Sequence, residues 1–253
     1  MQWEALLANS RNTPTWALQD FWGDLNPGFG HYADTYLVRD EVAARFTCQR
    51  AHVKAEVTGL PGNSKPPSAW QQRRMSRQLR SRLRLSDATP LIALCSQPLW
   101  NQRGYRETLR DILQQLPKGH LRVRMHPKEG PTERRHMRRL LRRHCATNWS
   151  FSDEQFDVFC AAADLMLSPF SNTGVDKAVF NSASIHAGGA TVFVLHNRRL
   201  RQLFQEWTGL QEHPLSSQGA CLGIYQRGRL KPLLQGALQR SGLAPQLLAA
   251  RLL

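Results

Sequence analysis

The feature that most constrains the fold is a series of short, apolar or alternating runs separated by segments of helical periodicity. Such runs occupy residues 90–96, 121–126, 163–168 and 190–196. Their length and apolar content are typical of strands buried on both faces of a parallel sheet. Because helical patterns stand between the runs, we predict an α/β protein with a Rossmann-like, doubly wound parallel sheet, flanked by helices and with right-handed crossovers.

A shorter set of elements precedes residue 60. The pattern predicts strands at 15–19, 34–38 and 54–59, and one helix that begins after an N-cap at Asp40. Residues 60–69 contain three prolines and a glycine, a composition typical of a linker. We therefore expect a partial N-terminal α/β segment (1–60), a linker with an Arg-rich helix (61–89), a Rossmann-like domain (90–228) and a C-terminal helical tail (229–253).

The chain is strongly basic. Lys and Arg total 34 against 19 Asp and Glu, which gives a formal net charge of +15. Much of the excess lies in residues 70–87 and 133–145, where apolar residues recur at helical spacing and Arg fills many of the other positions. Each segment is predicted to be a helix whose arginine face either is simply solvated or binds a polyanion or an anionic membrane surface.

Other sequence features bear on the compartment. The 253 residues contain no apolar run long enough to span a membrane, and the first residues lack the pattern of a signal peptide. The five cysteines form no CxxC pair, which favours reduced thiols, and the nine histidines show no metal-binding spacing. We expect a cytoplasmic protein without a bound metal, and leave open a peripheral location at the inner face of the membrane.

Polar residues follow three of the predicted strands. Ser96 and Gln97 end the first, the sequence Arg-Met-His-Pro (124–127) ends the second, and residues 168–174 lie between the third and a predicted helix. In an open α/β sheet, ligands bind in the crevice at the carboxyl ends of the strands. We therefore expect these residues to line one binding site.

The chemistry of these residues suits a diphosphate. Ser171, Asn172 and Thr173 would place hydroxyl and amide groups beside the backbone N–H groups of a helix N-terminus, which attracts phosphate. His126 can donate a hydrogen bond to the same phosphate or protonate a leaving oxygen. The three strand ends together predict a diphosphate site.

The order of these features resembles the C-terminal, donor-binding half of GT-B glycosyltransferases, especially the bacterial capsule-type group that includes sialyltransferases and glycerophosphate transferases. In that group an R-x-H-P-like motif ends one strand, and a D-x-x-x-S motif followed by Ser or Thr precedes a helix. Residues 124–127 match the first motif, and residues 164–168 with 171–173 match the second. The resemblance implies a nucleotide-activated sugar or polyol phosphate as donor substrate, a saccharide or lipid-linked acceptor, and no cofactor.

The resemblance also implies roles for individual residues. His126 would contact the donor diphosphate and take part in catalysis, Ser96 and Gln97 would line the nucleotide side, and Asp176 would hold the ribose or sugar. The candidate donor-binding residues are Ser96, Gln97, Arg124, His126, Pro127, Ser168, Ser171, Asn172, Thr173, Gly174 and Asp176.

The N-terminal part departs from the GT-B pattern. Complete members carry a full N-terminal domain with the acceptor site and the usual catalytic base, whereas only about 60 residues precede the linker here. Asp20 is the candidate base, with Asp24 and His31 as neighbours that also suit turns. The few strands before Gly59 need a cover, which we expect from the C-terminal tail, from a second copy, or from a separate partner that supplies an acceptor domain. Whether the chain alone is an active enzyme therefore stays open.

Two rival functions remain at this point. A UDP-sugar 2-epimerase would use similar phosphate-binding His and Ser residues, but it needs several acids near the sugar. A non-catalytic basic module that binds nucleic acid or anionic membrane would explain the net charge of +15, although no RNA-binding signature is present.

Overall fold

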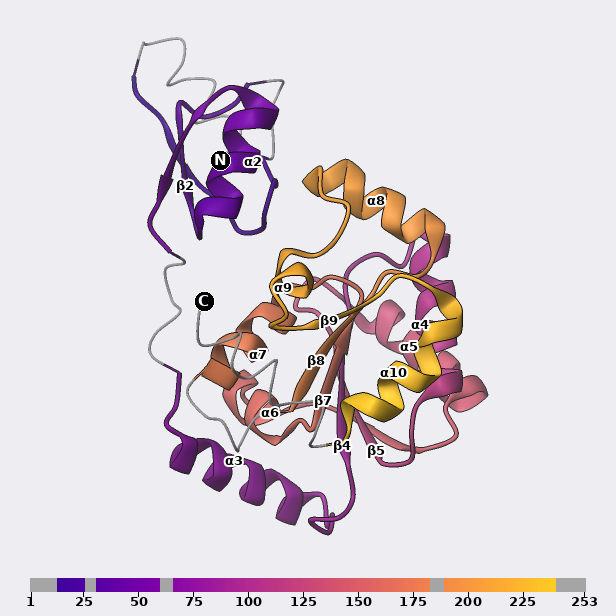
Figure 1. Ribbon diagram of the computed structural model, residues 1–253. Helices are drawn as coiled ribbons and strands as arrows, with labels where there is room; N and C mark the ends of the chain where they lie inside the picture. The colour runs from indigo at the N-terminus through magenta and orange to yellow at the C-terminus, as the bar shows by residue number, and fades with distance from the viewer. Residues whose placement is uncertain (1–12, 26–30, 60–65, 183–188, 240–253) are drawn as a thin grey trace. The chain divides into compact units, whose positions relative to one another are not determined.

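The computed structural model describes residues 13–25, 31–59, 66–182 and 189–239 (Figure 1). Contacts between residues divide the chain into two units: residues 1–64 with 202–211, and residues 65–201 with 212–253. The end of the predicted tail, residues 240–253, and most of the predicted linker, residues 60–65, lie outside the described residues. No described helix is both long and apolar enough to cross a membrane.

The smaller unit contains a parallel sheet of three strands in the order β1-β2-β3. Helix α2 connects the second strand to the third, as predicted. It begins after Asp40, whose carboxylate accepts the Ala43 backbone N–H at 2.7 Å and caps the helix. The elements are β1 (Trp16–Leu18), β2 (Thr35–Val38), α2 (Glu41–Ala51) and β3 (Lys54–Val57).

A segment from much later in the chain completes this smaller unit. It comprises residues 202–211, which include the end of helix α8 (Arg198–Thr208). The Arg50 guanidinium donates to the carbonyl oxygens of Glu206 at 2.6 Å and Trp207 at 2.5 Å. The ring of Phe204, which is fully buried, meets Phe21 edge-on. Sequence reasoning considered the C-terminal tail and a second chain as covers, and missed this internal segment.

The larger unit is built on a sheet of six parallel strands in the order β6-β5-β4-β7-β8-β9. From β4 the chain moves outward through β5 to β6, and it then returns to β7 and moves the opposite way. The direction of winding therefore reverses between β4 and β7, which confirms the predicted doubly wound sheet. The strands are β4 (Leu91–Cys95), β5 (His120–Arg124), β6 (Asn148–Phe151), β7 (Leu165–Ser168), β8 (Ala190–Val194) and β9 (Leu222–Ile224).

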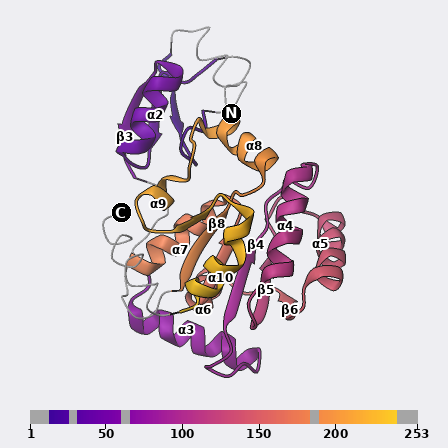
Figure 2. The same cartoon turned by 45° about the vertical axis from the view of Figure 1, so that its right-hand side comes forward.

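Helices cover both faces of the six-stranded sheet (Figures 1 and 2). One face carries α4 (Arg103–Gln115), α5 (Pro131–His144) and α10 (Leu230–Ala237). The other carries α3 (Ala69–Arg82), α6 (Phe156–Ala162) and α7 (Asn172–Ser182). Two short helices, α9 (Pro214–Ser217) and η1 (Arg227–Arg229), stand on either side of β9 in the chain.

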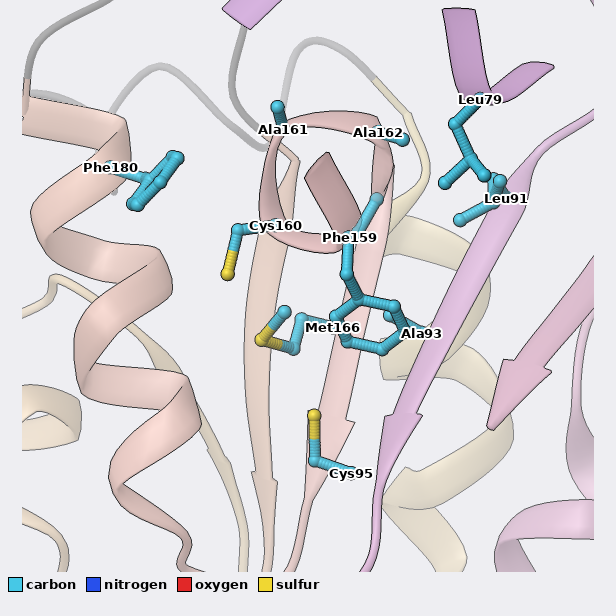
Figure 3. Packing of buried hydrophobic residues seen from close by; sticks show 11 residues of the cluster. Leu79, Leu91, Ala93, Cys95, Phe159, Cys160, Ala161, Ala162, Met166 and Phe180 are labelled. Atoms are coloured by element: carbon cyan, nitrogen blue, oxygen red, sulfur yellow. The ribbon is translucent and has the colours of Figure 1, made fainter. Parts of the chain in front are cut away.

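The core between α3, α6 and the sheet is shown in Figure 3. Leu79 of α3, Phe159 of α6 and Met166 of β7 are almost completely buried there. Each such side chain contributes about 1.5–3 kcal/mol by leaving water. Cys95 belongs to the same cluster, and burial raises the pKa of its thiol to about 12. Cys95 is therefore a core residue whose thiol stays protonated near neutral pH.

The two Arg-rich helices are anchored as their apolar periodicity predicts, but their arginines are not all solvated. Arg80 of α3 is 8% exposed, forms an ion pair with Asp164 and donates to the Thr89 carbonyl at 2.8 Å. Asp164 also accepts the Leu91 backbone N–H at 2.8 Å. Asp164 therefore joins α3 to the amino ends of β4 and β7, at the opposite end of β7 from Ser168.

Candidate active site

The residues that the sequence predicts to line a site follow strands of the six-stranded sheet at its carboxyl edge, where the ends of β4 and β7 are neighbours. Gln97, just after β4, accepts the backbone N–H of Phe170 through its side-chain oxygen at 3.1 Å. Its own backbone N–H donates to the Tyr105 hydroxyl at 2.8 Å. Gln97 is 8% exposed. It therefore ties together the two strand ends at which the winding of the sheet reverses.

The turn after β5 is held by Ser96 and Glu129. The Ser96 hydroxyl accepts the His126 backbone N–H at 3.0 Å and donates to the Glu129 carboxylate. Glu129 also accepts the His126 backbone N–H at 2.6 Å and the indole N–H of Trp100. Burial raises the pKa of Glu129, and the hydrogen bonds that it accepts offset only part of this rise. Ser96 and Glu129 thus fix the backbone of the turn at His126.

The hydrogen bonds of His126 define which ring nitrogen can reach a ligand. The Lys128 backbone N–H donates to His126 Nδ1 at 3.1 Å. Burial, and after it the positive charge of Lys128, lower the pKa of His126, so the ring is neutral near pH 7. A neutral ring that accepts at Nδ1 carries its proton on Nε2. Nε2 has no hydrogen-bond partner among the described residues, so His126 presents an N–H donor at the sheet edge.

Helix α7 begins at the same edge, directly after β7. The Ser168 hydroxyl accepts the Ser171 backbone N–H at 3.1 Å, and the Ser171 hydroxyl accepts the Thr173 backbone N–H at 3.3 Å. Ser171 therefore caps the helix. Because its oxygen accepts this bond, its hydroxyl proton stays available to donate to a ligand at the positive end of the helix dipole.

Two further residues at the start of α7 face the sheet. The Thr173 hydroxyl interacts with the Cys95 thiol and slightly offsets the rise in its pKa that burial causes. A Cβ atom added to Gly174 would lie 2.6 Å from the Phe193 ring, which is less than any normal contact. Gly174 thus lets α7 approach β8 closely. Thr173 and Gly174 together position the start of the helix against the sheet.

The remaining predicted site residues are placed as follows. The Arg124 guanidinium donates to the Glu154 carbonyl at 2.9 Å and lies 5.2 Å above the Phe156 ring, so it is used within the protein. Pro127 is exposed in the turn after β5, and Asp176 is half-buried in α7. Asp20 is exposed in the smaller unit. No group of three or more His, Cys, Asp or Glu side chains in the described ranges could hold a metal ion.

Sequence reasoning missed Glu129 and the role of Trp100. The signal was present, because Glu129 stands three residues after His126 in the run His-Pro-Lys-Glu, a spacing that closes a turn. The structure confirms that turn, since the Glu129 backbone N–H donates to the His126 carbonyl at 2.9 Å. A carboxylate at this position can reach back to the His126 backbone.

No protein-family model and no curated protein matches the chain. Solved structures do match it over nearly its whole length. Anabaena HepE (Alr3699) in complex with UDP-glucose aligns with a TM-score of 0.61 and 13% identity, over 100% of this chain and 71% of its own. The sucrose-phosphate synthase of Thermosynechococcus elongatus aligns with a TM-score of 0.61 and 14% identity, over 99% of this chain and 65% of its own.

A third structure, MurG of Acinetobacter baumannii, aligns with a TM-score of 0.52 and 16% identity, over 98% of this chain and 65% of its own. The fold is that of the GT-B glycosyltransferases. The expected fold class is therefore confirmed, and at these identities the likeness concerns the fold alone.

Proposed function

We propose that the chain is a GT-B-type glycosyltransferase whose larger unit binds a nucleotide-activated sugar or polyol phosphate. Transfer would be to a saccharide or lipid-linked acceptor in the synthesis of a polysaccharide or glycolipid. The observation that carries this proposal is the His126 turn at the carboxyl edge of the sheet, in which Nδ1 is occupied and the Nε2–H donor has no partner among the described residues. One of the structures with the same fold, Anabaena HepE, was solved with UDP-glucose.

The donor diphosphate would meet two sets of hydrogen-bond donors. His126 lies after β5 and Ser171 at the start of α7, and only β4 separates β5 from β7 in the sheet. Neighbouring strands are about 4.8 Å apart, so the two positions lie about 10 Å apart along the edge. This separation suits a diphosphate bound between them, with the nucleoside extending toward one side and the sugar toward the other.

The same donors would stabilise the transition state of transfer. As the bond between the anomeric carbon and the phosphate oxygen breaks, negative charge accumulates on the leaving diphosphate. The N–H of His126 and the N-terminal end of α7 would stabilise that charge without a metal ion. The acceptor hydroxyl would lose its proton to a base, for which Asp20 remains our candidate.

A thermal-shift panel of CMP, UDP, GDP and CDP tests the proposed donor site. A ligand at 100 times its dissociation constant stabilises the folded protein by about 2.7 kcal/mol, which is readily measured. We expect at least one of the four nucleotides to raise the melting temperature. If none does, the proposed site is wrong, and a basic module without a nucleotide site becomes the better explanation of the net charge of +15.

Product analysis then separates transfer from epimerisation. A transferase releases the nucleotide and forms a new glycosidic or phosphodiester bond in the presence of an acceptor. A UDP-sugar 2-epimerase would instead form an epimerised sugar with no acceptor present. Detection of that product would overturn the proposed reaction while leaving the nucleotide site intact.

A further inference from the structure

A groove of about 550 Å³ lies between α4 and α5 in the larger unit. Trp100, which precedes α4, and Arg106 of α4 line one side. His136, Arg139, Leu140 and Arg143 of α5 line the other. This volume falls within the range of about 300–1,000 Å³ that is usual for small-molecule sites.

The residues of α5 that line the groove form one stripe of the helix. They occupy positions 133, 136, 139, 140, 143 and 144, so that neighbours in the stripe are three or four residues apart. Met137 and Leu141 form a separate, fully buried stripe that anchors the helix to the core. Arg134 and Arg138 use a further side, where both guanidinium groups lie above the Phe151 ring. Within the groove stripe, the His136 ring packs against Trp100 with centroids 5.8 Å apart, and His144 Nδ1 lies 3.4 Å from the Gln114 amide nitrogen. The two arginines of the stripe make no such contact with the described residues.

The groove carries an excess of unpaired positive charge. Neither Arg139 nor Arg143 forms an ion pair or hydrogen bond with any residue of the described ranges. They stand four residues apart, a spacing at which like charges on a helix repel each other. The one carboxylate in the lining, Glu133, already accepts the Gly130 backbone N–H at 2.9 Å. An anion between the two arginines would relieve this repulsion.

The geometry of the arginine side chain favours phosphate among the anions that the groove could bind. Guanidinium groups present planar pairs of donors that match the oxygens of a phosphate. Leu140 and the indole of Trp100 add apolar walls that suit the organic part of a phosphate ester. We propose that the groove binds a phosphate-bearing group, at a site separate from the diphosphate site at the sheet edge and independent of the proposed transferase activity.

Binding measurements with two probes test this site on the full chain. Glycerol 3-phosphate, followed by calorimetry, represents a soluble ester. Vesicles of phosphatidylcholine with phosphatidylglycerol, followed by co-sedimentation against pure phosphatidylcholine, represent a lipid headgroup. Binding of the first probe identifies a soluble ligand, and binding of the vesicles alone identifies a membrane lipid. If neither probe binds, the proposal is overturned.

A matched pair of variants ties the binding to the groove. Arg139→Gln with Arg143→Gln removes two charges from the lining. The control, Arg135→Gln with Arg142→Gln, removes two charges from exposed positions of the same helix outside the lining. We expect at least about tenfold weaker binding in the first variant and a change of less than about threefold in the control, because charge-assisted hydrogen bonds are lost only in the first.

Two outcomes would contradict a separate phosphate site. Equal weakening in both double variants would show that the helix attracts anions through its overall charge and not through the groove. Loss of UDP binding in the groove variant alone would show that the groove belongs to the donor site. Unchanged UDP binding together with lost glycerol 3-phosphate or vesicle binding is the expected result.

Discussion

The Glu129 carboxylate accepts the backbone N–H of His126 at 2.6 Å. Glu129 is half-buried, and its burial raises the pKa of its carboxyl group. The contact connects this carboxylate to the turn that carries His126, the proposed hydrogen-bond donor to the phosphate. Ser96 and Trp100 donate to the same carboxylate. The position of the His126 ring therefore depends on three elements: the end of β4, the residues before α4, and the turn itself.

Substitutions of His126 can separate its two ring nitrogens. Asn places an amide oxygen near the position of Nδ1 and can still accept the Lys128 backbone N–H, but it lacks a donor at the position of Nε2. Gln extends its amide to the position of Nε2. We expect His126→Asn to weaken binding of the nucleotide by about 1–3 kcal/mol, and His126→Gln to weaken it less. Calorimetry with the nucleotide that stabilises the protein measures both. Equal affinity in all three proteins would remove His126 from the site.

Replacement of Glu129 by Ala leaves the Trp100 indole N–H and the Ser96 hydroxyl without their acceptor. Buried donors without partners cost about 1–3 kcal/mol each, so we expect the free energy of unfolding to fall by about 2–4 kcal/mol. Nucleotide binding should weaken as well, because the His126 turn loses its anchor. Urea unfolding checks the first effect, with Glu212→Ala as the control at an exposed position. A fully stable variant would mean that water replaces the carboxylate.

The close approach of α7 to β8 gives a prediction for packing. Gly174→Ala places a methyl group 2.6 Å from the Phe193 ring, and that ring is itself stacked on His213 with centroids 3.6 Å apart. Because the ring has little room to move, we expect a loss of about 1–3 kcal/mol in the free energy of unfolding. The smaller side chain of Phe193→Leu should recover part of that loss in the double variant. Strictly additive effects in a double-mutant cycle would contradict a direct clash.

The ion pair between Glu154 and Arg122 predicts how stability depends on pH. Burial alone would raise the pKa of Glu154, but hydrogen bonds from Arg122 and from the backbone, with the charge of Arg122, lower it to about 2. A depressed carboxyl pKa contributes stability above the unfolded value of 4.5, and that stability is lost as the pH falls from there toward 2. The contribution at neutral pH is about 3 kcal/mol.

Acid titration of the unfolding free energy checks this expectation. Glu154→Gln should be less stable than the natural chain at pH 7, and its stability should fall less steeply below pH 4.5, the ordinary pKa of the carboxyl group. Glu212→Gln, at an exposed position, should leave the acid slope unchanged. Parallel slopes in all three proteins would show that the Glu154 carboxyl does not titrate in this range.

Much of the larger sheet follows from local sequence pattern. Strands β4, β7 and β8 are buried on both faces, so each appears in the sequence as a short, continuous apolar run that can be recognised without the structure. The strands β6 and β9 at the two edges of the sheet were not predicted. The sequence of β6, NWSF, is short and mixed in polarity, because an edge strand is covered less completely.

The candidate site was predicted less fully than the fold. Pattern and resemblance placed His126 and Ser171 at one sheet edge, and the strand order agrees with that placement. They did not reveal that Ser96 and Gln97 accept backbone N–H groups of His126 and Phe170. Hydrogen bonds between segments far apart in the chain produce no regular pattern in the sequence. Helical periodicity likewise could not distinguish the buried Arg80 from the free Arg139, because both fit an arginine-rich face.

The smaller unit is discontinuous in the chain, because it includes residues 202–211 as well as the N-terminal residues. A single cut in the gene therefore cannot separate the two units. A fragment that starts after residue 64 would carry Phe204 and Leu210, which are at most 4% exposed in the intact protein, without the β1–β3 unit that buries them. A fragment that ends there would lack the carbonyl groups to which Arg50 donates. A cut at residue 64 therefore separates groups that pack together, so a chimera with another protein of this fold should keep residues 202–211 together with strands β1–β3.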